Sequence, residues 1–164
     1  YNDRRKSCEN VAAAICKHHP EVKSLRDANY ELLDEVRGEV SKEDALRAHY
    51  VIGEKERVME VSAALEKEDY EEVGKKMYET HDGLSREYEV SCPELDFLVD
   101  VARDCGVSGA RVMGGGFGGC TINLVSQELY ANFIDKARKS YQEKFGKAPI
   151  VIDVVIGDGA RKLC

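Results

Sequence analysis

The sequence lacks any apolar run that approaches the roughly 20 residues of a membrane-spanning helix. It also lacks an excess of basic residues, since 24 lysines and arginines stand against 31 aspartates and glutamates and the formal net charge is −7 at pH 7. Because the phosphates of nucleic acids attract basic surfaces, this balance argues against nucleic acid as a main partner. We therefore expect neither a membrane nor a nucleic acid partner.

The six cysteines lack the spacing of a metal site. No C-x-x-C pair and no suitably spaced histidine accompanies them, so the sequence predicts no zinc site. A chain of 164 residues can bury a proper core without disulfide bonds. We expect free thiols, as in a reducing cytosol, and hence a cytoplasmic protein in which Cys92 and Cys105 pack in the interior.

Apolar residues recur with the period of amphipathic helices along much of the chain. Pro20 ends the first of these helices because proline cannot continue the hydrogen-bond ladder. Asp69 is placed to cap the fourth helix, and Ser91 to cap the fifth with Glu94 closing a capping box. The predicted helices are Arg4–Lys17, Leu25–Val36, Lys42–Lys67, Tyr70–Leu84, Pro93–Cys105 and Gln127–Phe145.

Three segments predict strands. Ala110–Met113 is short and apolar, and Cys120–Val125 alternates apolar and polar residues as a half-buried strand does. Ile150–Ile156 is rich in β-branched residues, and Ala160–Leu163 is a candidate extension of it. The order of elements indicates an α+β fold, in which an antiparallel sheet is covered on one face by helices and preceded by a helical segment. No repeat or composition shift marks a second domain.

Five glycines and one phenylalanine form the stretch between the first two of these strands. Gly114-x-Gly116-x-x-Gly119 matches the dinucleotide fingerprint literally, but such a loop must open a helix, and here a strand follows. No Gly-Lys-Ser/Thr ending makes it a Walker-type phosphate loop. A tight hairpin turn is the alternative, yet it needs only about one or two glycines. We interpret the loop as ligand-proximal, with Phe117 as its anchor.

Other residues that carry chemistry form no convincing constellation. His81 lies near a predicted helix end, where a lone histidine is usually a satisfied terminal residue, and His18-His19 precede a proline without a metal partner. Glu87, Glu89 and Asp96 can pair as carboxylates, although charges near a helix start usually complement its dipole. We expect no catalytic residue and no metal ligand in this chain.

Four stretches, in order along the chain, carry a resemblance to a known family. They are Tyr1-Asn2-x-Arg4-Arg5 with Cys8-Glu9, Tyr88 to Asp96, Gly109-Ala110-Arg111 with the glycine loop, and Asp158-Gly159-Ala160. Together they resemble the C-terminal half of galactokinases, within the GHMP small-molecule kinase superfamily. Residues 1–164 are therefore expected to be one GHMP kinase C-terminal domain. Since the chain begins without methionine, we expect a fragment of a longer, two-lobed kinase from which the N-terminal lobe is missing.

The resemblance implies that the whole protein phosphorylates galactose to galactose 1-phosphate with ATP and Mg²⁺, both bound mainly by the N-terminal lobe. That lobe would also be this chain's partner. The family's catalytic Asp and Arg do not occur here, so the fragment alone is expected to be inactive. The resemblance implies that Tyr1 contacts the sugar. It also implies that six residues form a wall beside the phosphate-binding loop and ATP: Gly114, Gly115, Gly116, Phe117, Gly118 and Gly119.

Alternatives stay open. The whole protein can be a GHMP kinase for a related acceptor such as N-acetylgalactosamine, or a non-catalytic galactokinase-like sugar sensor, and the chain can also be a stand-alone interaction module. Two departures bear on competence: Arg111-Val112-Met113 stands where the family commonly has Arg-Met-Thr, and Ser85-Arg86-Glu87 where it has Arg-Asp-Asp. The sequence fixes neither the sugar acceptor nor the oligomeric state.

Overall fold

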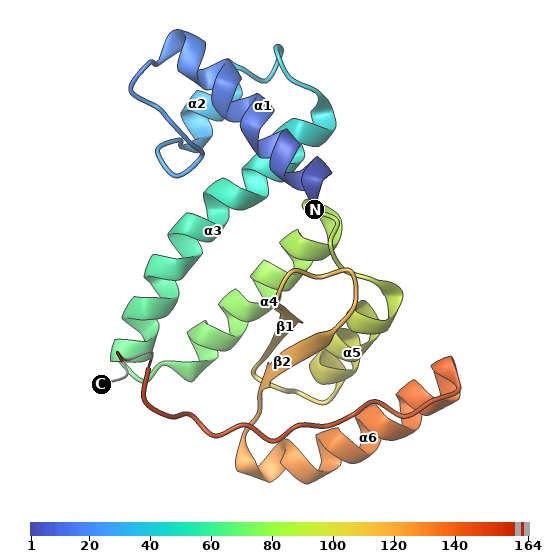
Figure 1. Cartoon of the computed structure of the whole chain (residues 1–164). Coiled ribbons are helices and arrows are strands. Elements are labelled where there is room, and N and C mark those ends of the chain that lie inside the picture. The colour runs from blue at the N-terminus through green and yellow to red at the C-terminus, as the bar shows by residue number, and fades with distance from the viewer. Residues whose placement is uncertain (160–161, 163–164) are drawn as a thin grey trace.

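The structure is a computed structural model that describes residues 1–159 and 162. Within them, the chain forms six helices and a single antiparallel hairpin of two strands (Figure 1). None of these helices is both long and apolar enough to cross a membrane. The elements are α1 (Asn2–His18), α2 (Tyr30–Glu35), α3 (Lys42–Glu66), α4 (Tyr70–Arg86), α5 (Pro93–Asp104), β1 (Gly109–Met113), β2 (Cys120–Leu124) and α6 (Gln127–Phe145).

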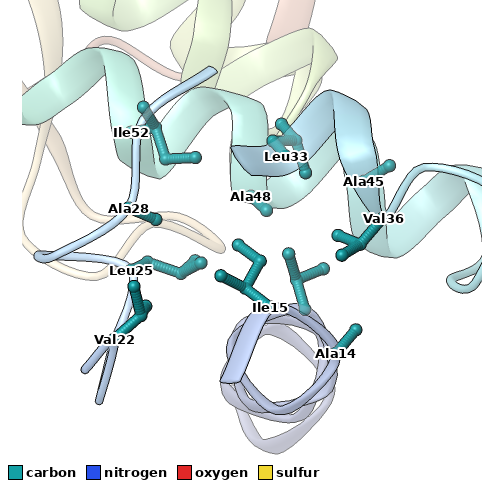
Figure 2. Close-up of a cluster of buried hydrophobic side chains, with 11 residues drawn as sticks. Ala14, Ile15, Val22, Leu25, Ala28, Leu33, Val36, Ala45, Ala48 and Ile52 are labelled. Carbon is teal, nitrogen blue, oxygen red and sulfur yellow. The ribbon is translucent and has the colours of Figure 1, made fainter. Parts of the chain in front are cut away.

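One end of the molecule is a helical unit built on a core of aliphatic side chains. α1 and α2 pack against the N-terminal part of α3, and Ile15 of α1 points toward Leu33 of α2 between them (Figures 1 and 2). The burial of Val11 and Ile15, one helical turn apart, follows from the i, i+4 spacing on one face of α1. This is the predicted helical segment that precedes the sheet.

The other end contains the hairpin and the helices that cover it. β1 and β2 pair in antiparallel register, with Gly109 opposite Leu124 and Met113 opposite Cys120. α4 and α5 pack on the hairpin, and α6 packs on α5 (Figure 1). Val99 and Ala102 of α5 share a core with Ala110 of β1 and with α6. The predicted α+β class, an antiparallel sheet covered by helices, is confirmed.

The second predicted helix is wrong over its first part. Only Tyr30–Glu35 is helical, because Asn29 caps it by accepting a hydrogen bond from the backbone N–H of Leu32 at 2.9 Å. Before the cap, the Asp27 carboxylate accepts bonds from the backbone N–H groups of Lys23 and Ser24, each at 3.1 Å. Such side-chain bonds offer the backbone an alternative to the helical ladder, so this segment forms a turn instead.

Two further predictions about element ends have different outcomes. The Asp69 cap is confirmed, since its carboxylate accepts from the backbone N–H of Glu72 at 3.0 Å. The Ser91 capping box is wrong, because Cys92 is the N-cap of α5 and makes no side-chain cap. The Ser91 hydroxyl instead donates to Asp96 Oδ1 at 2.5 Å, inside the first turn of the helix.

The strand predicted at Ile150–Ile156 is also wrong. The segment has no regular secondary structure, and all its side chains except that of Val151 are exposed, with Ile152 at 74% and Ile156 at 99%. β-Branched residues favour a strand only when a neighbouring strand pairs with them, and the hairpin does not extend to this tail. Its suggested extension, Ala160–Leu163, lies outside the described residues apart from Lys162.

The described cysteines, Cys8, Cys16, Cys92, Cys105 and Cys120, are free thiols. Cys92 and Cys105 are half-buried, so the prediction that they pack in the interior holds in part. Burial raises the pKa of the Cys8 thiol, whose sulfur lies 3.8 Å from the hydroxyl of Tyr88. That contact ties α1 to the segment between α4 and α5.

Candidate functional site

The glycine loop connects β1 to β2 through a run of left-handed backbone. Gly114 and Gly116 each have φ of 78°, while Gly118 and Gly119 have φ of 120° and 94°. L-Residues with a Cβ rarely adopt such angles, whereas glycine does so without steric cost. Four of the five glycines are therefore required by the path of the chain itself, which a tight two-residue turn would not explain.

Two of these glycines are also required by close neighbours. A Cβ on Gly115 would collide with the hydroxyl of Tyr1, and one on Gly116 would lie 2.8 Å from Val90 Cβ and closer still to the Val90 carbonyl oxygen. By contrast, a Cβ on Gly114, Gly118 or Gly119 would meet no described atom within 4 Å. One part of the loop therefore packs on the chain, and the other part borders open space.

Phe117 is held by its backbone more than by burial of its ring. Its N–H donates to the Val90 carbonyl at 2.6 Å, and its φ of 58° is unusual for a residue other than glycine. The half-exposed ring meets Tyr1 edge-on, with centroids 5.2 Å apart, and the Arg4 guanidinium lies 5.3 Å from its centroid. These contacts fix the middle of the loop beside the start of α1.

A cavity of about 370 Å³ opens where the loop meets the start of α1. The structure thus brings Tyr1 together with the loop, two sites that the sequence analysis had joined only through a family resemblance. Arg4 and Arg5 border the cavity, and Arg5 Nε donates to Glu9 Oε1 at 2.8 Å. The lining residues are Tyr1, Asn2, Arg4, Arg5, Leu84, Tyr88, Val90, Gly114 and Gly115.

One phenol of the cavity lining, that of Tyr88, stays protonated near neutral pH. Tyr88, the phenol that lines it deepest in the fold, has its pKa raised to about 12, first by burial and then by the neighbouring Cys8. The guanidinium of Arg4 donates to the carbonyls of Tyr88 and Glu89, at 3.0 and 2.5 Å. The Arg4 side chain is therefore used in holding the Tyr88–Glu89 backbone beside the cavity.

The carboxylates of Glu87, Glu89 and Asp96, which the sequence offered as candidates for pairing, each bind a different set of side chains. Glu87 meets His49 Nδ1 at 2.7 Å, whereas Glu89 Oε2 accepts from Arg47 Nη2 at 3.0 Å. Asp96 Oδ2 accepts from the Ser85 hydroxyl at 3.0 Å and shares its other oxygen with Ser91. Each carboxylate has its own partners, so the structure offers no acid–base dyad among them.

His81 does not lie at a helix end, because α4 continues to Arg86. It is only 4% exposed, with Nε2 at 3.3 Å from Asp96 Oδ1 and Nδ1 buried without a hydrogen-bond partner in the described structure. Burial lowers the pKa of His81, against the opposing effect of Asp96. The expectation of a satisfied terminal histidine is therefore wrong.

Sequence reasoning missed the residues that support the loop. Val90 holds Phe117 and crowds Gly116, yet in the sequence it is an ordinary apolar residue before a helix. Arg4 begins a predicted helix, but no pattern in the sequence shows that its side chain is mostly buried against the Tyr88–Glu89 backbone. The available signal was their occurrence in the stretches that match the family.

No cluster of three or more potential metal ligands occurs in the described part of the chain.

Comparison with known proteins assigns the fold and the loop to a family. The family model described as GHMP kinases C terminal matches residues 61–143, which include α4, α5, the glycine loop and most of α6. The chain therefore belongs to the GHMP kinases and contains their C-terminal domain.

Within that family the chain resembles galactokinases, as the sequence predicted. It is 43% identical to human galactokinase over the whole of this chain and 40% of that enzyme. It is 37% identical to galactokinase of Thermotoga maritima over 99% of this chain and 44% of that enzyme. The crystal structure of Lactococcus lactis galactokinase complexed with galactose matches with a TM-score of 0.82 and 27% identity, over 90% of this chain and 38% of that one. The chain thus spans less than half the length of these relatives.

Proposed function

We propose that this chain is the C-terminal lobe of a galactokinase and that the whole protein phosphorylates galactose with ATP and Mg²⁺. The observation that carries the proposal is the meeting of Tyr1 with Gly115 at a cavity bordered by Arg4 and Arg5. Support comes from the likeness to galactokinases along the full chain and from the galactose that the Lactococcus structure contains. Residues 1–164 act here as one domain beside an N-terminal lobe.

In this proposal the glycine loop forms the wall of the site next to the phosphates of ATP. Gly114, Gly118 and Gly119 border open space where a Cβ would lie, so a ligand can approach the loop backbone from that side. Unhindered amides and nearby guanidinium groups stabilise phosphoryl oxygens without any chemistry of their own. Mg²⁺ would be held by the other lobe, since the described residues bring no ligand cluster together.

Tyr1 contacts the sugar in this proposal. Its ring stands edge-on to Phe117 and its hydroxyl lies against Gly115, so the phenol is fixed at the cavity wall. A positioned hydroxyl orients a sugar for in-line transfer, which is the main task in phosphoryl transfer. We propose that the lobe on its own transfers no phosphoryl group, because the catalytic Asp and Arg of the family do not occur in it.

The test is ATP turnover by the whole protein with galactose, N-acetylgalactosamine, glucose and mevalonate, in wild type and Tyr1→Phe. We expect turnover with galactose alone, and a raised KM for galactose in Y1F with the KM for ATP unchanged. The control is Tyr70→Phe, since Tyr70 is exposed on α4 and does not line the cavity. Turnover of N-acetylgalactosamine instead would indicate a related acceptor. Galactose binding without turnover would indicate a sensor, and both results would overturn the proposal.

A further inference from the structure

Glu89 has a backbone conformation that needs support. It lies between α4 and α5 with φ of 54°, in the left-handed region that a residue with a long side chain rarely occupies. Such a conformation is strained for a residue other than glycine, so the surrounding contacts must fix it. The side-chain contacts to this segment come from α1 and α3, and the Val90 N–H also donates to the Leu84 carbonyl of α4 at 2.9 Å.

Arg4 of α1 fixes the backbone of the segment. Its Nε donates to the Tyr88 carbonyl at 3.0 Å and its Nη2 to the Glu89 carbonyl at 2.5 Å. The same guanidinium lies 4.0 Å from the Glu89 carboxylate. One side chain therefore bonds two successive carbonyls, which defines the direction of the peptide planes on both sides of the left-handed residue.

Arg47 of α3 fixes the side chain. It is only 5% exposed, and its Nη2 donates to Glu89 Oε2 at 3.0 Å while its Nη1 donates to the Ser7 hydroxyl at 3.0 Å. Glu43, one turn earlier on α3, is its other carboxylate partner. A buried guanidinium needs such partners, because an unpaired charge in the interior is costly.

The residue after Glu89 connects this arrangement to the cavity. The Val90 carbonyl accepts the Phe117 N–H at 2.6 Å and lies where a Cβ on Gly116 would be. The direction of that carbonyl depends on the conformation of Glu89, since the two residues are adjacent. Contacts therefore run without a break from Arg47, through Glu89 and Val90, to the middle of the glycine loop.

We propose that Glu89 is a positioning residue for the glycine loop: its carboxylate, held by Arg47 and Arg4, aims the Val90 carbonyl at Phe117 and so sets the shape of the cavity wall. Its effect on phosphorylation of galactose rests on the proposed function. Its effect on the loop rests on the contacts alone.

The experiment uses the whole protein with Glu89→Gly, Glu89→Gln and a matched control, Glu43→Gln. Glycine adopts φ near 54° freely, so E89G removes the carboxylate without adding strain. E43Q removes a carboxylate from the same Arg47 but does not touch the Tyr88–Val90 segment. The direct readout is hydrogen exchange of the Phe117 amide, and the functional readout is the KM for galactose at matched melting temperature.

We expect exchange at Phe117 to be about tenfold faster in E89G, the equivalent of losing one charge-assisted hydrogen bond, with E89Q intermediate and E43Q like wild type. The KM for galactose should rise in the same order. Unchanged Phe117 exchange in folded E89G, or in E89Q if E89G does not fold, would overturn the proposal. Equal acceleration in E43Q would also overturn it, because general loosening around Arg47 would then suffice. Faster exchange in a protein without galactokinase activity would support the positioning role and count against the proposed function alone.

Discussion

Gly74 of α4 and Gly109 of β1 face each other so closely that a Cβ added to Gly109 would lie 2.5 Å from the Gly74 Cα. A Cβ on Gly74 would collide with the carbonyl of Ser108. Helix and strand therefore meet backbone to backbone, and no side chain separates them. This contact sets the position of β1, and through it the position of the glycine loop, relative to α4.

We predict that Gly74→Ala destabilises the protein by about 1–3 kcal/mol, as overpacking does when the neighbour is backbone and cannot rotate away. Chemical denaturation of the whole protein measures the change in the free energy of unfolding. Gly38→Ala is the control, because a Cβ there would meet nothing within 4 Å in the described structure. Equal stability of G74A and G38A would contradict the backbone contact.

Gly115→Ala is expected to act on the site more than on stability. The new methyl group would displace the Tyr1 hydroxyl, which is an end of a side chain and can move. If Tyr1 orients the sugar, the KM for galactose should rise by about fivefold or more, which corresponds to roughly 1 kcal/mol of lost binding. Steady-state kinetics of the whole protein measure it, and an unchanged KM would argue against a sugar contact by Tyr1.

The buried histidine predicts a pH dependence of stability. Burial lowers the pKa of His81 below its ordinary 6.5, so between those two values the unfolded chain binds a proton that the folded chain does not. The free energy of unfolding should therefore be highest above about pH 7 and should decrease as the pH drops below 6.5. The charged groups that act on His81 are Asp96, Asp82, Arg103 and Asp100.

His81→Gln removes this titration and keeps a polar side chain of similar reach. Melting temperatures measured between about pH 7 and pH 5 should fall less steeply in H81Q than in wild type, whatever the offset between the two proteins. Parallel curves over that range would show that His81 takes up its proton equally in both states, and the prediction would fail.

A proline substitution in the exposed tail can tell whether the segment is irregular, as in the structure, or a strand, as the sequence predicted. Ile152→Pro should change the free energy of unfolding by less than about 0.5 kcal/mol, because the segment at Ile152 has no regular secondary structure. Ala137→Pro, inside α6, is the positive control, with a loss of about 3 kcal/mol or more. A comparable loss in I152P would show that the tail pairs as the strand that its β-branched residues favour.

The sequence predicted most of the helices because their signals are local. The apolar spacing of α6 placed it at Gln127–Phe145, and Asp69 predicted the start of α4 through a cap that the structure contains. Leu25–Val36 failed because the bonds made by Asp27 compete with the helix. Ile150–Ile156 failed for a different reason: pairing depends on a partner strand, which no pattern within the segment reveals.

The candidate site was predictable only in part. The glycines are visible in the sequence, and so is the fact that they exceed the need of a turn. Their reasons are not visible, because Gly115 and Gly116 are determined by Tyr1 and Val90, which are distant in the sequence. The left-handed angle of Glu89 and its bonds to Arg4 and Arg47 are also long-range, so charge pattern alone suggested only a solvated carboxylate.

The cavity wall takes its shape from residues on α1, on α3 and before α5, although the loop itself lies between two strands. If the proposed function holds, a change in sugar preference therefore need not come from substitution of the residues that contact the sugar. Substitutions inside the helical unit that shift α1 against α3 would move Arg4 relative to Arg47, and with them the Glu89 segment that supports the loop. In a laboratory selection for new acceptors, such remote positions would be more productive than Gly114, Gly116, Gly118 and Gly119, whose positive φ angles leave little freedom to vary.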